Sequence, residues 1–256
     1  MRQRSPAMSR TRALAAAATT AVTASTVAAC SVTGTAAESE PVTILAAASL
    51  AGVMPELVRA SEERHPDRDY EVSYAGSSAI VQQLNAGAPA DAVVLAGETP
   101  LTGLDSSVDR GRVRIVATNT LAVTLARENP GEVKALEDLA RKDVTVVLCA
   151  EQVPCGQAAQ QVFERADLAV NVASYEPDVR ATLSKVTSGE ADAALVYVTD
   201  AATTDLPVLE LPADVDVRNR YPAFSVNGSV AGGELVSELR SASSRALWRE
   251  AGFGLP

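Results

Sequence analysis

The sequence predicts an α/β protein in which parallel strands alternate with covering helices. Its 256 residues, 47% hydrophobic and 21% charged, are enough for one large domain or two small ones. Apolar runs of strand length alternate with amphipathic stretches of helix length, which is typical of parallel sheets connected by helices. Beyond residue 40, neither an internal repeat nor a low-complexity block interrupts this alternation.

The first elements follow a polar stretch that ends at Glu40. The run at 42–48 is apolar except for Thr43, as in a buried strand, and Val53, Leu57 and Val58 then recur at helical spacing. The expected elements are a strand at 42–48, a helix at 50–63, a strand at 70–75, a helix at 78–85 and a strand at 91–95.

A second set of elements begins at Leu121 and forms an α/β unit of its own. The tail returns to strand character at Val208 and is expected to complete the first unit. One lobe then comprises residues 41–120 and 201–256, and the other comprises residues 121–200. The expected elements are strands at 121–125, 144–148, 193–198 and 221–226, and helices at 133–141, 157–166, 179–187 and 234–250.

Charge and chemical inventory point away from nucleic acids and from catalysis. Lys and Arg number 22 against 32 Asp and Glu, a formal net charge of -10, and the sequence has no basic patch. It also lacks the glycine patterns of nucleotide loops and the Gly-x-Ser-x-Gly elbow of hydrolases. His65 is the only histidine and lies in a charged segment. We therefore expect no enzyme, no cofactor and no cation site.

The first 29 residues read as a secretory signal. Four arginines precede an Ala/Thr/Val run, and the segment contains no acidic residue. The run ends in Val-Ala-Ala-Cys, which resembles a bacterial lipobox and would make Cys30 the lipidated first residue of the mature chain. Ordinary cleavage near Ala29 is the alternative. With a linker at 30–40, the protein is expected at the cell membrane, anchored by lipid on the extracytoplasmic face.

Two further cysteines, Cys149 and Cys155, are close together in the sequence. Outside the cytoplasm, such a pair favours a disulfide. Two buried thiols are the alternative, and a zinc site would need additional ligands nearby.

Small polar residues stand where predicted strands give way to helices. At such junctions, unpaired helix N–H groups and hydroxyls can hold an anion without a formal positive charge. Each feature alone is typical of a helix cap. The four junctions are Ser49, Ser77 with Ser78, Cys155-Gly156, and Pro177-Asp-Val-Arg180.

Taken in order, these motifs resemble the periplasmic molybdate-binding protein of ABC transporters, over nearly all of the mature chain. The order is Ala-Ala-Ala-Ser-Leu, Tyr-Ala-Gly-Ser-Ser, Val-Pro-Cys-Gly, Asp-Val-Arg and Leu-Val-Tyr-Val-Thr-Asp. The resemblance implies a two-lobed type II periplasmic-binding-protein fold with the ligand cleft between the lobes. It also implies a monomer that works with permease and ATPase subunits. The implied molybdate-binding residues are Ser49, Ser77, Cys155, Val179 and Tyr197.

The chemistry of molybdate and tungstate fits hydroxyl and amide donors, because both anions are fully deprotonated at neutral pH and only accept hydrogen bonds. Cys155 replaces the Ala usual in the family, but a backbone N–H contact would survive the change. Whether Ser77 or Ser78 donates stays open, although the register favours Ser77, with Ser78 as the helix cap. Arg180 is expected to support the fold. With no histidine at the site, affinity is predicted to be constant between about pH 6 and 8.

Other functions remain as alternatives. A receptor of the same class could bind another oxyanion, such as sulfate or thiosulfate. A secreted hydrolase would need a general base that the sequence does not offer. A secreted interaction lipoprotein would bind none of these anions.

Overall fold

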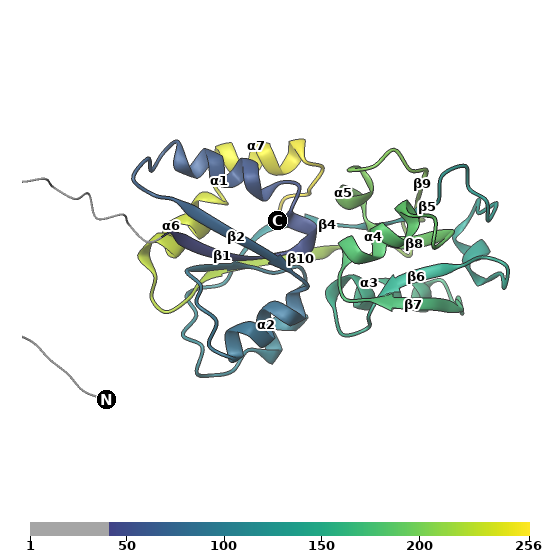
Figure 1. The fold of residues 1–256 in the computed structure, drawn as a ribbon, viewed down its shortest axis with the longest axis horizontal. Coiled ribbons are helices and arrows are strands. Elements are labelled where there is room, and N and C mark those ends of the chain that lie inside the picture. Colours follow the sequence, from purple (N-terminus) through teal and green to yellow (C-terminus); the bar gives the residue numbers. More distant parts are fainter. Residues whose placement is uncertain (1–40) are drawn as a thin grey trace, which may run out of the picture. The chain divides into compact units, whose positions relative to one another are not determined.

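The computed structural model describes residues 41–256, which form two five-stranded sheets with helices packed on them (Figure 1). The predicted signal at 1–29, Cys30 and the linker at 30–40 lie outside the described residues. Within the described part, no helix is long and apolar enough to cross a membrane.

The first sheet consists of β1 (Val42–Ala47), β2 (Tyr70–Ala75), β3 (Ala92–Val94), β4 (Arg114–Asn119) and β10 (Asn219–Ser225). Their order is β2-β1-β3-β10-β4. The first three strands run parallel, whereas β10 runs antiparallel to both β3 and β4. β1 is almost entirely buried, as expected for a central strand covered on both faces.

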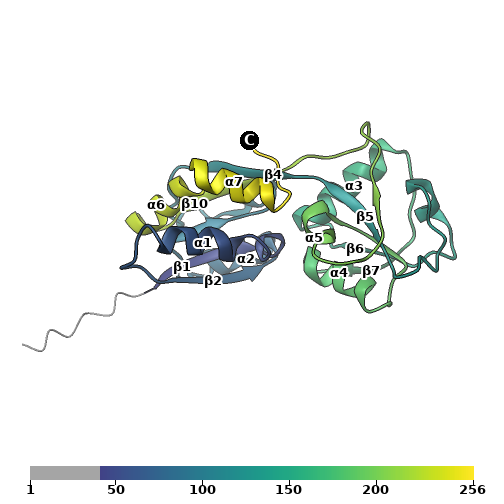
Figure 2. The same ribbon diagram turned by 90° about the horizontal axis from the view of Figure 1, so that it is seen from above.

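Helices lie on both faces of the first sheet (Figures 1 and 2), and each face has its own hydrophobic core. Because side chains alternate along a strand, Ile44 and Ala46 enter one core and Leu45 enters the other. The first core is covered by α1 (Met54–Glu62), α6 (Val230–Glu238) and α7 (Ala242–Glu250), and the second by α2 (Ser77–Asn85) and the 3-10 helix η2 (Thr99–Gly103).

The single C-terminal helix predicted at 234–250 is wrong, because two helices, α6 and α7, occupy this region. Ser241 starts the second helix, since its hydroxyl accepts a hydrogen bond from the backbone N–H of Ser244 at 3.1 Å. Trp248 then donates its indole N–H to the carbonyl of Leu239 at 2.9 Å. This bond ties α7 to the end of α6.

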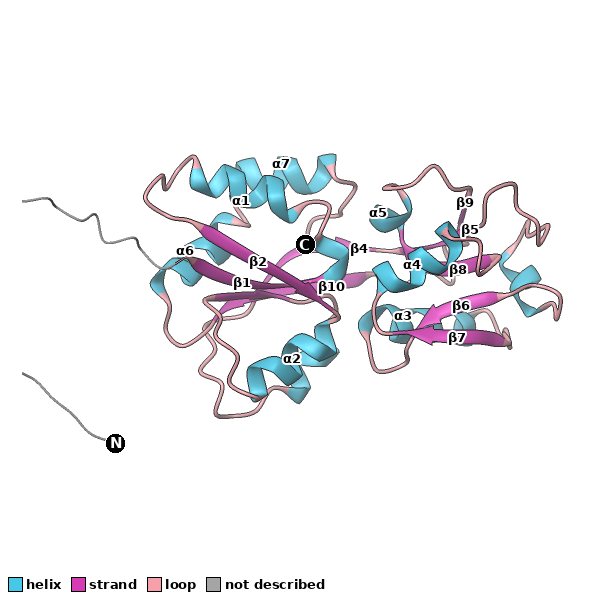
Figure 3. Cartoon of the chain, viewed as in Figure 1, coloured by secondary structure: helices cyan, strands magenta, loops and turns pink. Residues whose placement is uncertain are grey.

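The second sheet consists of β5 (Leu121–Leu125), β6 (Val146–Cys149), β7 (Val172–Glu176), β8 (Ala193–Tyr197) and β9 (Val208–Glu210). Their order is β7-β6-β8-β5-β9, with β5 antiparallel to β8 and β9 (Figure 3). Each sheet therefore combines three parallel strands with an antiparallel neighbour. The accompanying helices are η3 (Leu136–Ala140), α3 (Pro154–Arg165), α4 (Val179–Thr187) and α5 (Val198–Ala201).

The chain passes between the two sheets twice, once through Thr120 and once between Glu210 and Asn219. Strand β9 pairs with β5, and Leu206 and Val215 belong to the core of the second sheet. The lobe boundary predicted at residue 201 is therefore misplaced, and the return to the first sheet follows Glu210. The strand character at Val208 was predicted, but a three-residue edge strand that is largely exposed gives no indication in the sequence of which sheet it joins.

Candidate functional site

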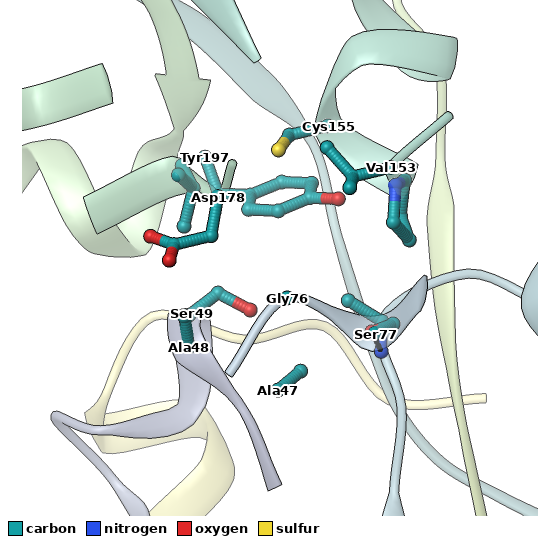
Figure 4. A pocket seen from close by; sticks show the side chains of 12 residues that line it. Ala47, Ala48, Ser49, Gly76, Ser77, Val153, Cys155, Asp178 and Tyr197 are labelled. Carbon is teal, nitrogen blue, oxygen red and sulfur yellow. Dashed lines mark hydrogen bonds between the residues drawn. The ribbon is translucent and has the colours of Figure 1, made fainter. Parts of the chain in front are cut away.

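A small cavity lies where the carboxyl ends of parallel strands from both sheets face one another (Figure 4). Its volume is about 20 Å³. That is slightly more than the ~10–15 Å³ needed to hold one water, so the cavity suits a small compact solute. All five residues predicted to bind the anion line it, namely Ser49, Ser77, Cys155, Val179 and Tyr197.

The first sheet contributes two serine hydroxyls. Ser49 lies in η1 (Ala48–Leu50), the short 3-10 helix that follows β1, and Ser77 is the first residue of α2. Both side chains are buried. Ser77 Oγ accepts a hydrogen bond from the backbone N–H of Ala96 at 2.8 Å, which fixes the position of the hydroxyl.

Ser78, the alternative to Ser77 as a donor to the anion, makes a hydrogen bond outside the cavity. Its hydroxyl donates to the backbone carbonyl of Gln152 at 2.5 Å, and Ser78 does not line the cavity. It is not the helix cap either, because Gly76 occupies that position. The geometry thus separates the roles of the two neighbouring serines.

The second sheet contributes backbone amides at two helix N-termini. In α3, Pro154 has no N–H, so Cys155 carries the first amide of the helix. In α4, the carboxylate of Asp178 accepts the amides of Arg180 and Ala181 at 2.8 and 3.0 Å. The amide of Val179 precedes both and is not one of the two amides that this carboxylate binds. The two N-termini favour negative charge in the cavity.

Tyr197 closes the cavity from the end of β8 and is 1% exposed. Asn219 Nδ2 donates to its phenolic oxygen at 2.9 Å. Burial raises the pKa of Tyr197 well above its ordinary value, so the hydroxyl keeps its proton. The side chain is therefore a hydrogen-bond donor throughout the physiological pH range.

The lining brings no positive side chain to the cavity. None of its residues is Lys or Arg, and Arg180 is exposed and lies outside the lining. Among the described residues, no group of three or more His, Cys, Asp or Glu could hold a metal ion. Attraction for an anion must therefore come from neutral donors and helix N-termini.

Loops from the two sheets meet around the cavity. Besides the bond from Ser78 to Gln152, a Cβ added at Gly76 would lie 2.7 Å from the carbonyl oxygen of Pro177. A Cβ added at Gly97 would lie 3.0 Å from Pro154. Such close approach requires glycine at Gly76, and it encloses the cavity on this side.

Cys149 and Cys155 form a disulfide with a Cα–Cα distance of 5.7 Å. It joins the end of β6 to the first turn of α3, whose N-terminus faces the cavity. Thr182 Oγ1 on α4 donates to the carbonyl oxygen of Asp178 at 2.9 Å and lies 3.3 Å from Cys149 Sγ, so the first turn of this helix packs against the same loop. The bond therefore stiffens one wall of the site.

Replacing both cysteines, as Cys149→Ala with Cys155→Ala, should weaken anion binding several-fold. It should also lower the free energy of unfolding by about 2 kcal/mol, because the short ring no longer restricts the unfolded chain. Calorimetry and urea denaturation of the oxidised wild type and the double variant measure both effects. Equal affinity in the two proteins would contradict a role for the disulfide in shaping this wall.

Asp200, a buried carboxylate beside the site, was not among the predicted site residues. It is 2% exposed, and its Oδ2 has no hydrogen-bond partner among the described residues. Burial raises its pKa to about 7, while nearby Arg180 opposes the shift and Asp178 adds to it. Asp200 lines a second cavity of about 310 Å³, and Ser49 lines both cavities.

A buried polar group behind the cavity was also missed. It consists of Asn119, Asn219 and Tyr221, whose side chains contact Thr199, Tyr197 and Ser49, respectively. The segment Arg-Asn-Arg at 218–220 carries no local signal of burial. Only the pairing of β10 with β4, which sets Asn219 opposite Asn119, brings this group together.

Residues 42–254 match the model of the bacterial extracellular solute-binding protein family, and the chain belongs to this family. A relative in this class is the molybdate-binding protein ModA of Mycobacterium tuberculosis, with 29% identity over 221 residues, 84% of this chain and 85% of that protein. Membership indicates a solute-binding role outside the cytoplasm, as predicted.

Solved structures show the same architecture. The periplasmic molybdate-binding protein of Azotobacter vinelandii has a TM-score of 0.73 at 20% identity, covering 84% of this chain and 99% of that one. The sulfate-binding protein SubI of Mycobacterium tuberculosis has a TM-score of 0.69 at 17% identity, covering 83% and 86%. The predicted fold class is thus confirmed.

Proposed function

We propose that the protein captures molybdate, and tungstate as a second ligand, and delivers it to the permease and ATPase subunits of an ABC transporter. It performs no chemistry on the anion. Membership of the solute-binding family supports the receptor role. The relative named for molybdate binding, which aligns over 84% of this chain, supports the choice of anion.

One observation carries the proposal: the five groups proposed to touch the anion are all hydrogen-bond donors in one small cavity. Three are hydroxyls, of Ser49, Ser77 and Tyr197, and two are the amides of Cys155 and Val179. Molybdate and tungstate offer only acceptors, so every contact can be satisfied. The one carboxylate in the lining, that of Asp178, caps α4 by accepting two backbone amides through its Oδ1.

Sulfate and thiosulfate are the second candidates, since they too present only acceptor oxygens to these donors. The likeness to a sulfate-binding protein concerns the fold alone and does not choose between the anions. Discrimination would then depend on the size of the cavity, because the hydrogen-bonding pattern is the same.

Calorimetric titration of the dialysed protein tests the proposal with molybdate, tungstate, sulfate, thiosulfate and hydrogen phosphate. We expect saturable binding of one anion per chain for molybdate and tungstate, with hydrogen phosphate bound far more weakly. Binding of sulfate or thiosulfate alone would assign the protein to the second candidate function. No heat with any of the five anions would contradict an oxyanion receptor.

The proposal extends to the cell surface. With Cys30 lipidated, the receptor is held at the extracytoplasmic face of the cell membrane as a monomer, next to its permease. The lipobox-like Val-Ala-Ala-Cys at 27–30 and the polar linker after it support this location.

A further inference from the structure

Each hydroxyl in the cavity has a hydrogen-bond partner within the protein. The Ala96 amide donates to Ser77 Oγ at 2.8 Å, and Asn219 Nδ2 donates to Tyr197 Oη at 2.9 Å. Ser49 Oγ lies 3.1 Å from Tyr221 Oη. These partners decide whether a hydroxyl presents its proton or its lone pair to a bound anion, since each hydroxyl has a single proton.

For Tyr197 the direction follows from the chemistry of the amide. Asn219 Nδ2 can only donate, so the phenolic oxygen accepts and its proton must point to another acceptor. The ring is 1% exposed and lines the cavity, so the proton has little access to bulk water. An anion oxygen bound in the cavity would be the acceptor for the proton of the Tyr197 hydroxyl.

The hydroxyl proton of Ser49 is also oriented toward the cavity, through a longer chain of hydrogen bonds. Asn119 Nδ2 lies 3.4 Å from Tyr221 Oη and 2.7 Å from Thr199 Oγ1, and it donates to both. Tyr221 Oη accepts from Asn119, so its own proton can be given to Ser49 Oγ, which lies 3.1 Å away. The hydroxyl of Ser49 is then free to donate into the cavity.

Asn219 also has a distinctive place in the fold. It is the first residue of β10, where the chain re-enters the first sheet, whereas Tyr197 ends β8 of the second sheet. The side chain is 8% exposed. A buried amide at this position restricts the Tyr197 hydroxyl without itself lining the cavity.

We propose that Asn219 is a positioning residue, which holds the proton of the Tyr197 hydroxyl toward the bound anion and so selects fully deprotonated oxyanions over those that carry a proton. This inference rests on the proposed function. A protonated oxyanion must donate its own O–H to an acceptor. A Tyr197 hydroxyl that is held as a donor cannot accept that hydrogen bond.

The first test uses Asn219→Asp, which reverses the direction of the hydrogen bond between residue 219 and the Tyr197 hydroxyl. The carboxylate can only accept, so Tyr197 donates to it and offers a lone pair to the ligand. The added negative charge weakens the binding of every dianion. This effect cancels in the ratio of the dissociation constants for hydrogen phosphate and molybdate at pH 8, because both are dianions at that pH. We expect this ratio to fall at least tenfold in the variant, measured by displacement of tungstate. An unchanged ratio would overturn the inference.

The second test is a double-mutant cycle with Asn219→Leu and Tyr197→Phe. Asn219→Leu alone should weaken molybdate binding about three- to tenfold, and it should have no further effect when Tyr197 is already Phe. Independent losses that multiply in the double variant would show that Asn219 does not act through Tyr197. Thermal melts establish that each variant is folded.

Tyr197→Phe alone supplies a test that does not depend on the folding of Asn219 variants. If the hydroxyl is held as a donor, its removal weakens the binding of molybdate at least as much as the binding of hydrogen phosphate. A larger loss for hydrogen phosphate would mean that the hydroxyl turns to accept a proton, which overturns the inference. If the wild type binds molybdate, the proposed function stands whichever result these variants give. If the wild type does not bind molybdate, the proposed function itself is contradicted.

Discussion

The Ser49→Ala and Ser77→Ala variants should each bind molybdate about ten- to a hundredfold more weakly than the wild type. Each change removes a hydrogen bond from a neutral hydroxyl to a charged oxygen, worth about 1.5–3 kcal/mol in a desolvated site. The anion oxygen is then left without that donor, because bulk water has little access to so small a cavity. Both serines are buried in its lining.

Calorimetry with molybdate measures this loss, and two further serine variants serve as controls. Ser73→Ala changes an exposed residue of β2 and should leave the affinity unchanged. Ser78→Ala removes the bond to the Gln152 carbonyl but no contact with the anion, so its effect should be much smaller than that of Ser77→Ala. Wild-type affinity in both the Ser49 and the Ser77 variants would contradict the proposed site.

The strand–helix junctions were predictable from the sequence because their signals are local. The apolar run of β1 and the shorter strand β2 are each followed by small polar residues, where Ser49 and Ser77 lie. The junction at 177–180, which contains Val179, was also visible locally, whereas Tyr197 came from the family resemblance alone. Parallel strands place such ends at one edge of a sheet, so a local pattern predicts a site in three dimensions.

The residues behind the cavity could not be predicted in this way. Asn119 and Tyr221 are 102 positions apart in the sequence, and their contact depends on the antiparallel pairing of β10 with β4. Nor was β4 itself predicted. The burial of Asp200 likewise depends on packing of the C-terminal segment near α5, with Phe253 lining the same cavity.

Asp200 changes the pH dependence expected from the sequence. Its carboxylate acts electrostatically on Tyr197, which lines the anion cavity, and on Tyr221, which contacts Ser49. Ionised Asp200 would therefore repel a bound dianion, whereas neutral Asp200 would not. Because its pKa is raised to about 7, molybdate affinity should fall as the pH rises through 7, rather than staying constant between about 6 and 8.

The same group makes the stability of the empty protein depend on pH. The pKa of Asp200 is about 7 in the folded chain against an ordinary value of 3.8, so the folded state holds a proton that the unfolded state has lost between these values. The free energy of unfolding therefore decreases as the pH rises from about 4 to 7, and the cost of the buried charge is constant above that. The total cost is on the order of 4 kcal/mol.

The Asp200→Asn variant should remove both effects. Relative to the wild type, its free energy of unfolding should rise by about 3 kcal/mol more at pH 8 than at pH 5, because only the ionised form of Asp200 is costly to bury. Any pH-independent effect of the new amide cancels in this comparison. Urea denaturation at the two pH values measures the difference, and calorimetry from pH 6 to 8 should give a flat molybdate affinity for the variant and a declining one for the wild type. Parallel profiles in both experiments would mean that Asp200 stays ionised in the folded protein, with Arg180 or another cation compensating its charge.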